Sequence, residues 1–109
     1  MINVHCLSRP EQGLYALCIR GHACYAPYGA DIVCAAVSTL GYTFAAALQR
    51  LYSEGALSAP PQIREREGFL CALGRADPAH NAVLAQTYET VMTGLMLLAE
   101  SYPEHIRLR

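Results

Sequence analysis

The stretch that decides the fold is residues 32–52, IVCAAVSTLGYTFAAALQRLY, which carries no charge before Arg50. At 3.6 residues per turn it is long enough for about six turns of helix. It is apolar on nearly every side, which is typical of a buried helix. Asp31 precedes it and offers a carboxylate to the first-turn N–H groups. We expect a central helix, covered by a sheet on one side and by another element on the other.

The same stretch approaches the length of a membrane span. Ser38, Thr39 and Thr43 lie in its middle, which favours a buried helix of a globular domain. The first residues lack a basic segment followed by an apolar one, so no targeting signal is predicted. We therefore expect a cytoplasmic protein.

Strand patterns lie on both sides of this helix. Residues 2–7 and 14–20 predict a first hairpin, with breakers at 8–13, and Tyr15, Leu17 and Ile19 on one strand face. Residues 63–75 predict a second hairpin that turns at Gly68. There the residues of one parity are Phe69, Cys71 and Leu73.

The end of the chain predicts a second long helix. Asp77 and Pro78 are typical of a cap and a first helical position. One face repeats at spacings of three and four, and its residues are Leu84, Tyr88, Val91, Leu95 and Leu98. Pro103 ends this helix, and residues 106–109 add a short strand. The order ββαββα predicts an α+β fold, with two layers and helices packed on a mixed sheet.

Composition limits the classes of protein. The chain has 109 residues, enough for a single domain over residues 1–109. Hydrophobic residues make up 53% and charged residues 16%, which excludes a disordered chain. The net charge is −1, from eight arginines, no lysine and nine acids. A general nucleic-acid binder needs a basic excess, so no direct nucleic-acid partner and no membrane are expected, although a local arginine patch stays open.

The cysteines predict a reduced, metal-free protein. They are Cys6, Cys18, Cys24, Cys34 and Cys71. An odd number without a secretion signal favours reduced thiols, and Cys6, Cys18 and Cys71 fit the cores of strands. A zinc site at Cys18, Cys24 and Cys34 with His22 matches no common ligand spacing, because an extended strand would place Cys18 roughly 13 Å from His22. We expect no metal and no cofactor.

Cys34 is the first candidate for chemistry. Behind an Asp31 cap it is the third residue of the helix, where free N–H groups and the helix dipole favour a thiolate and lower the pKa of a cysteine. A small core residue is the alternative. His22 stands twelve residues earlier, just past the second strand. A cysteine and a histidine brought together form a nucleophile and its base.

Other residues have two interpretations each. Asp31 caps the helix or orients His22 as the third member of a triad. Ser38 lies one turn after Cys34 and hydrogen-bonds near the thiol or back to its own helix. Tyr25 and Tyr28, on the loop that also holds Gly29, contact a peptide or are plain surface residues.

The motif around these residues resembles a known family. Gly21-His22-Ala23, followed by residues 28–38, YGADIVCAAVS, is similar to the signature of the ribosomal-processing cysteine proteases, called Prp. Residues 94–95 and 100–103, GL and ESYP, resemble the ending of that family. The resemblance spans nearly the whole chain.

The resemblance implies a small homodimeric cysteine protease. It implies Cys34 as nucleophile, His22 as base, and Gly21, Asp31 and Ser38 as supporting positions. The implied substrate is the twenty-seventh protein of the large ribosomal subunit, made with an N-terminal extension resembling Leu-Asn-Leu-Gln-Phe-Phe. Backbone N–H groups at the helix start are expected to hold the oxyanion.

Two further hypotheses come from other classes of protein. One is a non-catalytic module that assists ribosome assembly by binding RNA or a ribosomal protein. The other is a thiol switch that joins Cys34 to Cys24 on oxidation.

Overall fold

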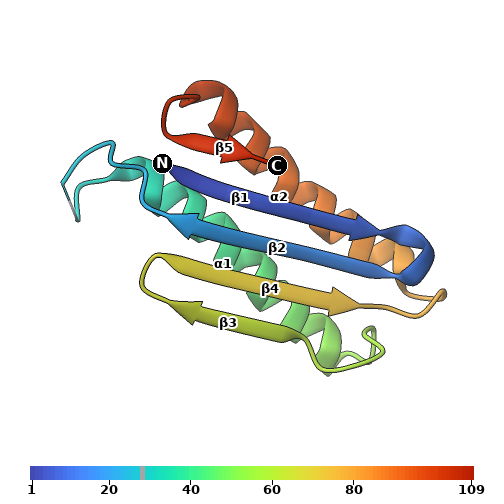
Figure 1. Cartoon of the computed structure of the whole chain (residues 1–109). Coiled ribbons are helices and arrows are strands. Elements are labelled where there is room, and N and C mark those ends of the chain that lie inside the picture. Colours follow the sequence, from blue (N-terminus) through green and yellow to red (C-terminus); the bar gives the residue numbers. More distant parts are fainter. Residues whose placement is uncertain (28) are drawn as a thin grey trace.

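The computed structural model describes residues 1–27 and 29–109, which form one five-stranded sheet with two long helices (Figure 1). The elements in chain order are β1 (Ile2–Arg9), a 3-10 turn (Pro10–Gln12), β2 (Leu14–Gly21), α1 (Ile32–Ser53), β3 (Gln62–Arg66), β4 (Phe69–Arg75), α2 (Asn81–Ser101) and β5 (Ile106–Leu108). The strand order is β3-β4-β2-β1-β5, and β5 runs parallel to β1 while the other pairs are antiparallel. The predicted α+β class, element order and mixed sheet are confirmed.

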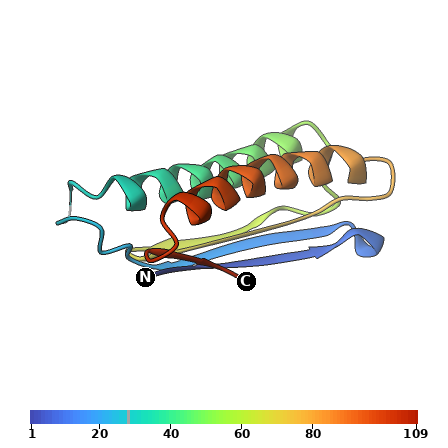
Figure 2. The same cartoon turned by 90° about the horizontal axis from the view of Figure 1, so that it is seen from above.

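Both helices lie on the same face of the sheet, so the molecule has two layers (Figure 2). The core fills the space between these layers. Alternate strand residues point into it, as the period of two requires, and on β2 these are Tyr15, Leu17 and Ile19. The fully buried side chains from the helices are Val33, Val37, Phe44, Leu48, Leu84 and Leu95.

The expected central position of α1 is wrong. α2 lies beside α1 in one layer, so the outer face of α1 stays exposed, and Tyr42 is 50% exposed there. Both helices pass a length and hydropathy test for membrane spans. Helices that pack on a sheet pass the same test, so the two helices give only weak evidence for a membrane protein.

The start of the second long helix differs from the prediction. α2 begins at Asn81 rather than Pro78, because Asp77 closes a separate turn, in which its carboxylate accepts a hydrogen bond from the His80 N–H. The second hairpin turns at Gly68 as predicted. On β4, Leu70 and Ala72 face the helices, while Phe69, Cys71 and Leu73 face away from them.

The prediction of five reduced cysteines is wrong for one pair. Cys18 on β2 and Cys71 on β4 are direct cross-strand neighbours, and the structure joins them in a disulfide. Both lie half-buried on the face away from the helices. The pairing depends on strand register across 53 residues, which cysteine spacing does not reveal. Cys6, Cys24 and Cys34 are free thiols.

Gly13 should be the glycine least tolerant of a side chain. Its φ is +65°, and an added Cβ would collide with the backbone oxygen of Ala76. We expect Gly13→Ala to lower the free energy of unfolding by about 2–4 kcal/mol, from the left-handed conformation and the displaced backbone. Gly55→Ala is the matched control, because Gly55 has φ +78° and open space, so only about 1–2 kcal/mol should be lost. Urea unfolding of both variants measures the difference, and equal losses would contradict the collision.

Candidate active site

The N-terminus of α1 is fixed by Asp31, as predicted. Its Oδ1 accepts hydrogen bonds from the N–H groups of Val33 at 3.0 Å and Cys34 at 2.9 Å. Its Oδ2 accepts from the N–H of Tyr25 at 3.0 Å. One carboxylate therefore caps the helix and ties it to the loop that follows β2. The alternative role, orienting His22, has no hydrogen bond to support it among the described residues.

The Cys34 thiol accepts a hydrogen bond from the backbone of the loop that follows β2. The N–H of Ala23 donates to Cys34 Sγ at 3.1 Å, and Ala23 itself is buried. On its other side, the carbonyl oxygen of Ala23 accepts a hydrogen bond from His105 Nδ1 at 2.8 Å. The ring of Tyr25 packs edge-on against His105. The turn before β5 thus holds the peptide that faces the thiol.

His22 lies at the end of β2, beside the hairpin turn of β3 and β4. The N–H of Gly21 donates to the carbonyl oxygen of Gly68 at 2.9 Å, which ties the end of β2 to the turn between β3 and β4. A Cβ at Gly68 would stand 3.1 Å from His22 Nε2, so the imidazole rests against this glycine. His22 is itself exposed. A ring held by packing on one side keeps its other side open to a ligand.

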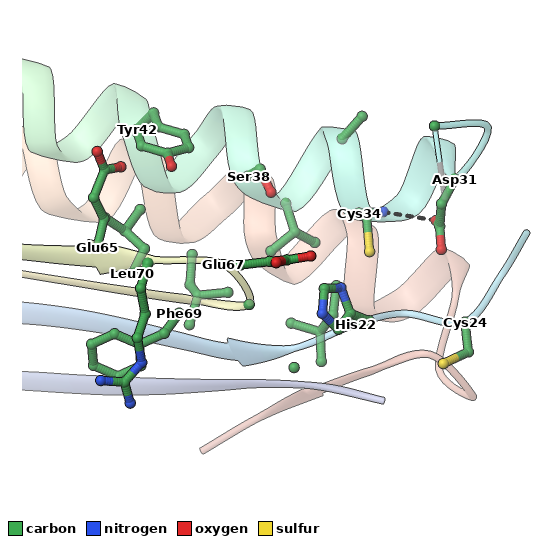
Figure 3. Close-up of a pocket in the computed structure, with 18 of the residues that line it drawn as sticks. His22, Cys24, Asp31, Cys34, Ser38, Tyr42, Glu65, Glu67, Phe69 and Leu70 are labelled. Atoms are coloured by element: carbon green, nitrogen blue, oxygen red, sulfur yellow. Dashed lines mark hydrogen bonds between the residues drawn. The ribbon is translucent and has the colours of Figure 1, made fainter. Parts of the chain in front are cut away.

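His22 and Cys34 line one cavity of about 1030 Å³, which we call the main cavity (Figure 3). It extends from these two residues along α1 and the β3–β4 turn. Its apolar lining includes Ile2, Ile19, Val37, Phe69 and Leu70. Its polar lining includes Ser38, Tyr42, Glu65, Arg66 and Glu67. A cavity of this size, with an apolar floor and polar groups on its rim, accommodates a short stretch of peptide.

The electrostatics of Cys34 correct one prediction. Burial, followed by the negative charges of Asp31 and Cys24, raises the pKa of the Cys34 thiol, although the Ala23 N–H acts to lower it. The helix start was predicted to lower this pKa. That argument left out the burial of the thiol, which is the largest cause of the raised pKa, and the charge that the capping carboxylate adds at the helix start. The raised pKa favours the protonated thiol in the free protein.

The prediction for the oxyanion is also corrected. The N–H groups of Val33 and Cys34 are occupied by Asp31, and that of Ala35 donates to the Asp31 carbonyl oxygen at 3.1 Å. A capped helix start therefore leaves these donors unavailable to an oxyanion. The Ala23 N–H donates to the sulfur itself.

The family profile described as cysteine protease Prp matches residues 1–107. The chain belongs to the Prp family of cysteine proteases. A protein of Mycoplasma genitalium named ribosomal processing cysteine protease Prp is 36% identical over 93 residues, which are 83% of this chain and 82% of that protein.

Solved Prp structures share the fold. The Staphylococcus aureus enzyme with a covalently linked product peptide superposes with a TM-score of 0.76 at 28% identity, covering 100% of this chain and 98% of that one. The same enzyme with a substrate peptide gives a TM-score of 0.70 at 26% identity, with the same coverage. A Streptococcus mutans protein gives 0.70 at 28% identity, covering 100% and 92%.

The remaining predicted site residues fall in different places. Gly21, Ser38 and Gly29 line the main cavity with the two Prp motif residues His22 and Cys34. Tyr25 does not line it: its ring packs edge-on against Tyr102 and His105 instead. Tyr28 lies outside the described residues. The roles of these residues toward substrate stay predictions.

Sequence reasoning missed the residues that support the motif from a distance. His105 acts on Ala23 across 82 positions, and Gly68 contacts His22 across the sheet. Glu65 also borders the cavity, where its carboxylate raises the pKa of the Tyr42 hydroxyl. The sequence held one signal for the position of His105. Pro103 and the short final strand predict a turn, and His105 lies in this turn, which leads back to the sheet.

The charge of Asp31 predicts a pH effect. Asp31→Asn removes a negative charge near Cys34 but keeps a good capping residue. Because that charge raises the pKa of Cys34, the pH at which Cys34 becomes alkylated should move downward. Iodoacetamide labelling at a series of pH values, read for each cysteine by peptide mass spectrometry, measures this. Asp77→Asn, before α2, is the control and should leave the Cys34 curve in place. An unchanged or upward-moved curve in Asp31→Asn would contradict the assignment.

Proposed function

We propose that this protease removes the N-terminal extension of the twenty-seventh protein of the large ribosomal subunit, with Cys34 as nucleophile and His22 as base. The observation that carries the proposal is that both side chains line one cavity, where a backbone N–H donates to the sulfur. The names of the M. genitalium and S. aureus relatives, both ribosomal processing proteases, support the substrate class.

The reaction begins when substrate fills the main cavity and His22 takes the proton of the Cys34 thiol. The thiolate attacks the carbonyl carbon at the end of the extension, and an S–C bond forms. The imidazolium then gives its proton to the leaving amine as the C–N bond breaks. Water, deprotonated by His22, releases the acyl group and restores the thiol. A thiol that ionises only when its base is engaged stays unreactive in the empty enzyme, in line with its raised pKa.

The lining of the cavity supports an apolar substrate segment. Val37 and Leu70 belong to its apolar lining, and Ser38 follows Cys34 one turn later. The S. aureus relative is described with a substrate peptide and with a covalently linked product peptide, the two ligands that a cysteine protease of this mechanism binds.

The homodimer and the cytoplasmic location are part of the same proposal. Large apolar side chains outside the main cavity are exposed on the helices, among them Tyr52, Met96 and Leu97. A second copy would cover such a patch. Light scattering after size exclusion tests this, and a mass of one chain at micromolar concentration would reject the dimer.

Mass spectrometry of a peptide spanning the extension junction tests the cleavage. It is incubated with the wild type and with Cys34→Ser under reducing conditions. One cut by the wild type alone is expected. If the folded, reduced wild type leaves the junction peptide intact, the proposed substrate is wrong; if Cys34→Ser cuts it, the proposed nucleophile is wrong.

A further inference from the structure

The face of the sheet that the helices leave uncovered carries six of the eight arginines. Figure 1 views this face, with α1 and α2 behind it. Strand residues alternate between the two faces of the sheet. Near the strand ends, the side chains that point to the uncovered face are exposed. We call it the arginine face; its arginines are Arg9, Arg20, Arg64, Arg66, Arg75 and Arg107.

Strand register arranges these arginines in rows. One row crosses all five strands and consists of Arg107, Asn3, Arg20, Phe69 and Arg66. At the other end a row consists of Arg9, Leu14 and Arg75. On β1 the two rows are six positions apart, from Asn3 to Arg9, which is about 20 Å at 3.3 Å per residue. Between them lie His5, Leu7, Ala16, Leu73 and Gln62, with Arg64 beside the Cys18–Cys71 disulfide.

No acid balances this charge on the arginine face. Among the described strand residues, the acidic side chain is that of Glu65. It lies on the opposite face of the sheet, toward the helices, where its carboxylate interacts with the Tyr42 hydroxyl. In the described part of the chain, no arginine of this face forms an ion pair. Arg20 and Arg66 instead hold their guanidinium groups 5.1 and 4.8 Å from the centroid of the Phe69 ring. The net charge of −1 therefore hides a strongly positive face.

We propose that the arginine face binds single-stranded RNA. Unpaired guanidinium groups recognise phosphate oxygens, and their planes stack on unpaired bases. An open sheet with a charged, partly aromatic surface presents such groups to an extended strand. A second copy of the chain fits poorly, because twofold pairing of this face would oppose arginines to arginines. The proposal goes beyond cleavage and uses neither His22 nor Cys34.

The test is fluorescence anisotropy of a labelled 20-nucleotide uridine RNA, titrated with the full chain at several salt concentrations. Micromolar binding in 50 mM salt is expected, with log K falling linearly against log salt. About four to six phosphate contacts would give a slope of about −3 to −4, at 0.7 per contact for single strands. No binding in 50 mM salt would overturn the proposal.

The variant that tests the face is Arg64→Gln/Arg75→Gln/Arg107→Gln. These three exposed residues lie outside the main cavity. Affinity for the RNA should fall at least about tenfold, and the magnitude of the salt slope should drop by about two. Arg50→Gln, on α1, is the matched control and should change neither. Peptide cleavage by both variants should equal that of the wild type, which separates this result from any failure of the proposed protease function.

Other occupants of the face are distinguished in the same experiment. Poly-glutamate that competes as well as unlabelled RNA would assign the face to acidic protein and overturn the proposal. So would a change of oligomeric state in the triple variant, which would assign it to a second copy. If the variant fails to fold, amide NMR shifts of the wild type decide: RNA should move signals of the strands and leave those of Val83 and Met96 on α2 in place, and the opposite pattern would overturn the proposal.

Discussion

Replacing Cys34 with alanine should abolish cleavage of the junction peptide, lowering kcat/KM by at least about 10⁴-fold. Cys34 is the free cysteine that accepts the Ala23 N–H and faces the main cavity together with His22. Alanine keeps the helix start, because the Asp31 cap binds backbone N–H groups. The loss should therefore appear in kcat, with the peptide still bound. A stopped assay of peptide cleavage, with peptide binding measured separately, checks both parts.

The matched control for this variant is Cys6→Ser. Cys6 is a free thiol on β1 that packs toward Tyr88, outside the main cavity. It should retain cleavage close to that of the wild type. Full activity in Cys34→Ala, or equal losses in the two variants, would show that the thiol chemistry has been assigned to the wrong residue.

Replacing His22 with alanine should lower kcat by about 10²–10⁴-fold, the usual contribution of a general base. The pKa of Cys34 is raised above its ordinary value, so without a base little thiolate forms at neutral pH. The residual rate should keep rising with pH into the alkaline range, where solvent hydroxide removes the proton. The wild type should instead be active at neutral pH. Rate profiles from pH 6 to pH 10 measure the difference.

His80→Ala provides the control for a lost imidazole. His80 lies at the N-cap of α2 and pairs with Asp77, away from the main cavity. Its loss should leave the rate and its pH profile unchanged. If His22→Ala kept the pH profile of the wild type, another group would be the base.

Much of the fold could be predicted because its signals are local. An uncharged run behind Asp31 gave α1 within one residue of its bounds, and Gly68 gave the turn of the second hairpin. The open side of the sheet could not be predicted in the same way. Strand β2 reads LYALCIRG, with apolar residues on both parities, so its sequence does not show which parity faces the helices. Only the register with β4 shows that Cys18 and Cys71 meet.

The site was predicted in part for the same reason. A contiguous motif brought Asp31, Cys34 and Ser38 to one end of α1, and His22 follows from the end of β2. The pKa of Cys34 required the actual geometry, because burial and the charge of Asp31 raise it while the Ala23 N–H lowers it. His105 reaches the site from the far end of the sequence, and no local pattern marks it.

The contact between His105 and Ala23 has a consequence for the order of events on the ribosome that makes this enzyme. The loop that faces Cys34 is held by a residue translated 82 positions later, and β1 pairs with the still later residues of β5. Until that late segment has left the exit tunnel, β1 has no β5 partner and the Ala23 carbonyl has no hydrogen bond from His105. The loop that faces Cys34 can therefore reach its final hydrogen bonding only after residues 105–108 have been translated.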